Sequence, residues 1–130
     1  MKTLVLFCVL LINTIAFSQE GNFQYKGTIG TIKTDLALKL TISKDGCVYA
    51  FEGNYFNFKL NKDLQLKATL NPCKNDKENP DEKITLNELD GETVTGTFVL
   101  NGIGEHSCYG TWISPNGKKK LPVKFLLIEN

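Results

Sequence analysis

A histidine, a serine and a cysteine stand side by side in this chain, as His106, Ser107 and Cys108. A hydrolytic serine or cysteine needs a base within reach, an acid that orients the base, and an oxyanion hole. On a strand, Ser107 would point away from His106, whereas Cys108 would share its face. No residue pattern marks the orienting acid or the oxyanion hole. We therefore expect no catalytic residues and a protein that is not an enzyme.

Cysteine, histidine and acidic residues are also candidate metal ligands, but their spacing argues against a metal site. There is no Cys-x-x-Cys pair, and the single histidine could complete only a Cys3His set at odd spacing. The acidic residues between 71 and 82 lack the ligand spacing and central glycine of a calcium loop, and Pro80 interrupts them. We expect a solvated loop, with neither a metal nor another cofactor.

The run Lys118 to Lys120 follows a Pro-Asn-Gly turn sequence at 115–117. Lysines at a hairpin tip keep a turn soluble and blunt a strand edge; the alternative is contact with an anionic surface. The chain has no arginine, and without Lys2 its 14 lysines balance its 14 acidic residues. Nucleic-acid binders carry a basic surplus rich in arginine, so we expect no nucleic-acid partner.

The chain also holds many aromatic residues for its length: Tyr49, Phe51, Tyr55, Phe56, Phe58, Phe98 and Trp112. Their simplest role is to fill a core. The alternative is that some line a cavity, as in small ligand-binding barrels. In that case the candidate ligand-binding residues are Tyr49, Phe51, Tyr55 and Trp112.

Residues 1–18 have the three parts of a secretory signal peptide. Lys2 supplies the positive charge, an apolar segment runs from Leu4 to Ile12, and Ala16 and Ser18 are the small residues before a cleavage site. The apolar segment is too short to span a bilayer, and no basic cluster follows it. We expect export to the periplasm or the extracellular space, a single domain at 19–130, and no transmembrane segment in the mature chain.

Apolar and polar residues alternate with period two through the mature chain, which is typical of strands with one buried face. Short turns rich in Gly, Asn and Asp separate the runs. The pattern predicts an all-β fold with strands near 23–29, 35–43, 47–59, 64–70, 83–89, 93–100, 106–113 and 121–128. An even count in one antiparallel meander allows closure, as in lipocalin-like and avidin-like barrels.

The third of these strands changes phase, because apolar residues fall on odd positions at Tyr49 and Phe51 and on even positions at Phe56 and Phe58. A strand keeps one phase unless an extra residue is inserted. We therefore expect a β-bulge near Gly53. The alternative is two short strands with a tight turn at 52–54.

Cys47, Cys73 and Cys108 remain after cleavage, and an oxidising compartment predicts one disulfide and one free thiol. A hairpin turning at 61–63 would place residue 50 opposite residue 73, so Cys47 would lie close to Cys73. Cys108 reaches Cys73 only if the long 71–82 loop folds back. We favour Cys47–Cys73 and keep Cys73–Cys108 as the alternative.

An ordered series of short motifs runs through the mature chain: Gly27-Thr-Ile-Gly30, a Leu-x-Leu motif, Gly53-x-Tyr55, Leu64-x-Leu66, Ile84-x-Leu86-x-Glu88, Gly96-Thr-Phe98, Gly110-Thr-Trp112 and Lys120-Leu-Pro122. In this order they resemble a group of small exported Bacteroidetes proteins. The resemblance covers nearly the whole mature chain and implies export and a β-barrel-like fold.

Two functional hypotheses follow, in addition to a disfavoured hydrolase. The first is an exported, non-enzymatic binding module of the bacterial envelope, inhibitor-like by analogy of fold, whose partner is another protein or an envelope component. The second is a carrier of a small apolar ligand, which needs a cavity of at least about 300 Å³. A filled barrel with an exposed apolar patch or an ordered long loop favours the first.

Overall fold

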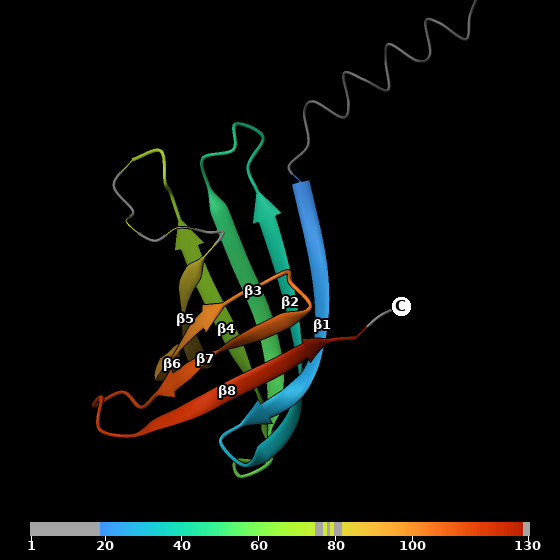
Figure 1. Cartoon of the computed structure of the whole chain (residues 1–130). Helices are drawn as coiled ribbons and strands as arrows, with labels where there is room; N and C mark the ends of the chain where they lie inside the picture. Colours follow the sequence, from blue (N-terminus) through green and yellow to red (C-terminus); the bar gives the residue numbers. More distant parts are fainter. Residues whose placement is uncertain (1–18, 75–76, 78, 80–81, 129–130) are drawn as a thin grey trace, which may run out of the picture.

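The computed structural model describes residues 19–74, 77, 79 and 82–128, so the predicted signal peptide lies outside the described residues. These residues form eight antiparallel strands in chain order around a closed barrel (Figure 1). The strands are β1 (Gln19–Ile29), β2 (Ile32–Ile42), β3 (Tyr49–Asn57), β4 (Lys62–Leu70), β5 (Lys83–Asp90), β6 (Thr93–Asn101), β7 (Ser107–Ile113) and β8 (Lys120–Leu127). The predicted eight-stranded meander is confirmed.

Closure is made by β1 and β8, which pair from Tyr25 opposite Leu127 to Ile29 opposite Val123. Every strand therefore has a hydrogen-bonded neighbour on both sides over part of its length. In such a meander the turns that follow odd-numbered strands lie at one end of the barrel, and the loops that follow even-numbered strands lie at the other. The Lys118 to Lys120 run and the described residues of the 71–82 segment are thus at opposite ends.

The inward-facing residues fill the barrel. Six side chains contributed by five strands have no exposed surface: Tyr25, Leu64, Leu66, Leu86, Leu100 and Cys108. A side chain that faced a water-sized internal cavity would expose surface to it, so no such space inside the barrel adjoins these six side chains. Over this part of the barrel the interior is a packed core, as expected for a barrel of this strand number.

The expected bulge at Gly53 is wrong, and so is the alternative turn at 52–54. Gly53 lies in unbroken register between Leu38 of β2 and Leu66 of β4. The inward face of β3 stays on odd positions, and Phe56 and Phe58 lie on the outside, where Phe58 is 64% exposed. The phase of β3 does not change; it looks changed in the sequence because the aromatic residues Phe56 and Phe58 lie on the outward face.

The register shift of this barrel is instead in the β5–β6 pair. Glu88 lies opposite Gly96, whereas Leu89 lies opposite Val94, so Thr95 is an extra residue of β6. A bulge of this kind turns the side chain of the extra residue out of its regular direction. Here it brings Thr95 to Glu88.

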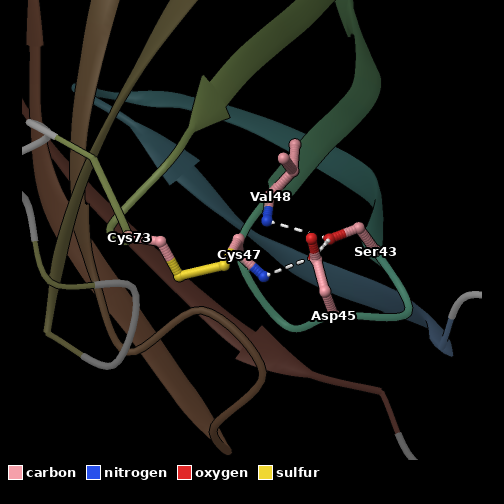
Figure 2. Close-up of a disulfide and its surroundings, with 5 residues drawn as sticks. All are labelled: Ser43, Asp45, Cys47, Val48 and Cys73. Atoms are coloured by element: carbon pink, nitrogen blue, oxygen red, sulfur yellow. Dashed lines mark hydrogen bonds between the residues drawn. A yellow bond between two sulfur atoms is a disulfide. The ribbon is translucent and has the colours of Figure 1, made fainter.

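A disulfide joins Cys47 to Cys73, as predicted (Figure 2). Its Cα–Cα distance is 5.2 Å, and Cys108 is a buried free thiol. The expected register is wrong in detail. Residue 50 pairs with Thr69 rather than with Cys73, because the β3–β4 turn occupies 58–61 rather than 61–63. In the observed register, the chain just before Tyr49 still lies beside the chain just after Leu70, so Cys47 meets Cys73.

Candidate functional site

A buried carboxyl group lies inside the barrel, near the end where the turns that follow odd-numbered strands are found. Glu88 is 2% exposed, and its two oxygens accept hydrogen bonds from three other side chains. Oε1 accepts from the Thr95 hydroxyl at 2.8 Å, and Oε2 accepts from Trp112 Nε1 at 3.1 Å and from the Tyr55 hydroxyl. Because buried polar groups are costly without partners, these bonds are what allow an acidic residue at this position.

Trp112 reaches Glu88 because Gly96 has no side chain. A Cβ at Gly96 would lie 2.4 Å from Trp112 Nε1 and 2.6 Å from Cε2. The indole therefore occupies the space above the β6 backbone that any other residue at 96 would fill. The Gly96-Thr-Phe98 and Gly110-Thr-Trp112 segments thus act together to position one hydrogen-bond donor.

Tyr55 completes the network from the other side of the barrel. Its ring packs edge-on against Phe98 with centroids 5.6 Å apart. Burial, followed by the hydrogen bond to Glu88, raises the pKa of the Tyr55 phenol above its usual range. Tyr55 is therefore a neutral donor at physiological pH.

A small pocket lies beside this network at the mouth of the barrel. It has a volume of about 90 Å³ and is lined by Ile29, Ile32, Tyr55, Asn57, Lys59, Trp112, Lys119 and Leu121. Sites for drug-sized ligands are about 300 Å³ or more, so this pocket accepts at most a few heavy atoms. It does, however, bring Lys59 of the β3–β4 turn and Lys119 of the β7–β8 turn to one opening.

The four residues predicted to bind a ligand therefore separate into two groups. Tyr55 and Trp112 meet at Glu88 and line the pocket. Phe51 is 2% exposed within the core, and Tyr49 packs against that core from the far end of β3. Glu88 is not among the residues that the sequence predicts to form a site. The signal was present, because Glu88 continues the inward phase of Ile84 and Leu86.

The His106, Ser107 and Cys108 segment does not bring its reactive groups together. His106 and Ser107 are exposed, whereas Cys108 is fully buried, so Cys108 does not share the surroundings of His106 as expected. Burial raises the pKa of the Cys108 thiol to about 12. A thiol with this pKa is almost entirely protonated at neutral pH and is a poor nucleophile.

A second cluster of residues lies on the outside, around the small pocket. We call it the tip surface and define it as Phe58, Lys59 and Leu60 of the β3–β4 turn and Lys118 and Lys119 of the β7–β8 turn. Phe58 is 64% and Leu60 is 51% exposed, and the three lysines are exposed. No ion pair to any of these lysines occurs among the residues that the structure describes.

The tip surface continues along the barrel wall as an open groove. The groove has a volume of about 840 Å³, and its lining includes Lys26, Lys33, Phe56 and Phe58. Phe56 and Phe58 stack edge-on with centroids 4.9 Å apart. The aromatic pair that imitates a phase change in the sequence is therefore an apolar feature of the surface, with Phe56 half-buried and Phe58 exposed, and it lies in a groove lined by Asp35 as well as by lysines.

The same six-residue turn sequence, Ser-x-Asx-Gly-x-x, occurs twice in the chain. The copy at 43–48 contains Cys47 of the disulfide, and the copy at 114–119 contains Lys118 and Lys119 of the tip surface. In each, the serine hydroxyl donates to the Asx Oδ1 (2.5 and 2.8 Å), which also accepts the amide two residues on (3.0 and 2.9 Å). The serine Oγ accepts a second amide at 3.0 Å in both turns. Figure 2 shows the first copy, which holds Cys47 for the disulfide.

These observations define the class of the protein as a closed, eight-stranded antiparallel barrel with a packed interior, a buried Glu88 network and an exposed basic and apolar tip. No protein-family model matches the chain, and neither a curated protein nor a solved structure shows significant similarity to it. Nowhere in the described part of the chain do three potential His, Cys, Asp or Glu ligands gather. Within the same residues, no helix has the length and apolar character needed to cross a membrane.

Proposed function

We propose that this chain is an exported, non-enzymatic binding module of the bacterial envelope that holds its partner at the tip surface. The observation that carries the proposal is the combination of a packed barrel interior with Phe58 and Leu60 exposed beside lysines. Clustered exposed apolar side chains with a polar surround are a mark of interaction sites. The Cys47–Cys73 disulfide supports export, because such bonds persist in oxidising compartments.

Carriage of a small apolar ligand receives less support. The pocket at Tyr55 and Trp112 has about 90 Å³, well below the volume of a drug-sized site. The donors of both residues are already used by Glu88. The network is better explained as a support that orders the mouth of the barrel beneath the tip surface.

The test is a binding measurement on isolated envelopes. Protein purified from the exported fraction should bind the envelope fraction of its source bacterium saturably. The double variant Phe58→Ser/Leu60→Ser should weaken this binding about tenfold or more, because it removes two apolar contacts. The matched control is Tyr109→Ser/Leu126→Ser, which removes two side chains that are 52% and 56% exposed on β7 and β8.

Unchanged binding by the control completes the expected result. The absence of saturable binding, or an equal loss in both double variants, would contradict the proposal.

A further inference from the structure

We infer that the tip surface docks on an anionic lipid bilayer, with its lysines at the headgroups and Phe58 and Leu60 at the boundary with the acyl chains. The inference rests on the proposed function and names the envelope component. It is carried by charge complementarity, by the exposed apolar side chains between the lysines, and by the fixed shape of both turns.

The charges come first. Lys59 and Lys119 open onto one pocket, and Lys118 adjoins Lys119 on the same turn. A lysine held near an anionic leaflet strengthens binding about fivefold. Two acidic residues lie on the barrel wall beside the tip surface: Asp63 of β4 pairs with Phe56, and Asp35 of β2 lines the groove together with Lys26 and Lys33. The other acidic residues at this end are on the β5–β6 turn, where Asp90 is paired with Lys62 at 2.9 Å. Glu92 remains on that side, so the barrel should tilt with the β5–β6 turn away from the lipid.

The apolar side chains form the second part of the argument. Phe58 and Leu60 flank Lys59, and all three are exposed. A lysine between two apolar residues suits a membrane interface, because its long stem lies along the apolar layer while its ammonium group stays among the headgroups. An aqueous surface gives no comparable reason to expose a phenylalanine and a leucine on one tight turn.

The third part is that both turns are ordered before they bind. Asn57 Oδ1 accepts the Leu60 amide at 3.0 Å, and Asn61 at φ 55° returns the chain to β4. On the other turn, Asn116 Oδ1 accepts the Lys118 amide at 2.9 Å, and Ser114 Oγ accepts the Lys119 amide at 3.0 Å. Because ordered turns lose little conformational entropy on docking, even the few contacts that this small surface makes can give measurable binding.

An acidic protein segment would also complement the lysines and is the rival occupant. A protein partner requires a shaped, complementary interface, whereas a bilayer accommodates projecting side chains without one. Phe58 and Leu60 project from a turn, and the pocket between the lysines is small. The larger groove beside them is open and carries Asp35 next to its lysines, which lowers its charge complementarity to an acidic segment. The geometry therefore favours the lipid surface.

The experiment measures sedimentation of the exported protein with two kinds of vesicle, pure phosphatidylcholine and phosphatidylcholine containing about one third phosphatidylglycerol. We expect binding to the anionic vesicles alone, and less binding as salt is raised. Lys118→Gln/Lys119→Gln should weaken it about 30-fold, and Phe58→Ser/Leu60→Ser about tenfold. The charge-matched control Lys44→Gln/Lys83→Gln changes two exposed lysines at the opposite end and should bind as the wild type.

The outcomes separate the two proposals. Envelope binding that depends on Phe58 and Leu60, together with no binding to anionic vesicles, overturns the lipid inference and leaves the proposed function in place with a protein partner. Loss of both kinds of binding overturns both proposals. Equal binding to neutral vesicles, or an equal loss in the Lys44/Lys83 control, overturns the lipid inference because the tip lysines would then have no specific role.

Discussion

At the scale of single residues, Glu88 illustrates why an acidic side chain can belong to the core of a barrel. Its donors come from three other positions, Tyr55 on β3, Thr95 on β6 and Trp112 on β7. Two of these depend on exceptions to regular strand structure, the bulge at Thr95 and the missing side chain of Gly96. The network therefore ties together strands that are not neighbours in the sheet.

Replacing Glu88 tests whether the hydrogen bonds to its side chain stabilise the barrel. Glu88→Gln keeps an oxygen for Trp112 and Tyr55 and turns its amide toward Thr95, whose hydroxyl can accept as well as donate. We expect it to lower the free energy of unfolding by about 1 kcal/mol. Glu88→Leu leaves buried donors without an acceptor and should cost about 3 kcal/mol.

Urea unfolding measures both variants, and fluorescence of Trp112, the only tryptophan, should shift in Glu88→Leu. Ile84→Ala on the same strand is the control; it should lower stability without moving the Trp112 emission. Equal stability of the Gln and Leu variants would show that the hydrogen bonds do not matter.

At the scale of elements, β1 is fastened to the β6–β7 loop by a buried tyrosine. The Tyr25 hydroxyl donates to the Glu105 carbonyl at 3.0 Å and accepts the Gly104 amide at 2.8 Å. Gly104 has φ +91°, a conformation that side chains disfavour, so the glycine allows the loop to turn its amide onto Tyr25. This contact joins chain positions 79 and 80 residues apart.

Tyr25 also makes the free energy of unfolding depend on pH in the alkaline range. Burial raises the pKa of Tyr25 to about 12 from 10.0, although the Gly104 hydrogen bond acts in the opposite direction. Between these values the unfolded chain loses the proton and the folded chain keeps it, so the unfolding free energy falls as pH rises. The contribution is complete below pH 10 and is lost by about pH 12, an effect on the order of 2 kcal/mol.

Tyr25→Phe should be less stable than the wild type at neutral pH by about 1 to 2 kcal/mol, and this difference should narrow between pH 10 and 12. Urea unfolding of both proteins over that range is the measurement. Tyr109→Phe, at a 52% exposed position, is the control and should follow the wild type. A constant difference between Tyr25→Phe and wild type at all pH values would argue against this role.

At the scale of the whole molecule, barrel closure and the disulfide restrain different parts of the chain. The β1–β8 pairing joins the first and last strands, and the Cys47–Cys73 bond joins the loops at the end remote from the tip surface. The bond spans 26 residues that include all of β3 and β4. It therefore restrains the unfolded chain without touching the tip surface.

Removing the disulfide should lower stability and leave binding unchanged. In the chain-entropy model, Cys47→Ser/Cys73→Ser should cost about 3 kcal/mol of unfolding free energy. Non-reducing peptide mass mapping of the wild type should show the Cys47–Cys73 pair, and urea unfolding should show the loss in the variant. A Cys47–Cys108 pair would contradict the observed register, and a loss of tip-surface binding in the variant would contradict the separation of the two ends.

Much of this architecture could be read from the sequence. Period-two alternation and turn residues such as Asn61 and Gly91 predict eight strands, and an even meander predicts closure. These signals are local, since each depends on a residue and its near neighbours in the chain. The Cys47–Cys73 pairing follows from strand order even though the expected register is displaced, because a shift within one hairpin leaves the same ends together.

The Glu88 network, the outward position of Phe56 and Phe58, and the Tyr25 contact were decided only by the tertiary structure. Alternation indicates which residues share a face, but an aromatic residue can occupy either face, so Phe56 and Phe58 imitate a change of phase that β3 does not make. Which side chains meet inside the barrel depends on strand stagger around its circumference and on the Thr95 bulge. Those are properties of the closed sheet, in which strands distant in sequence set each other's positions.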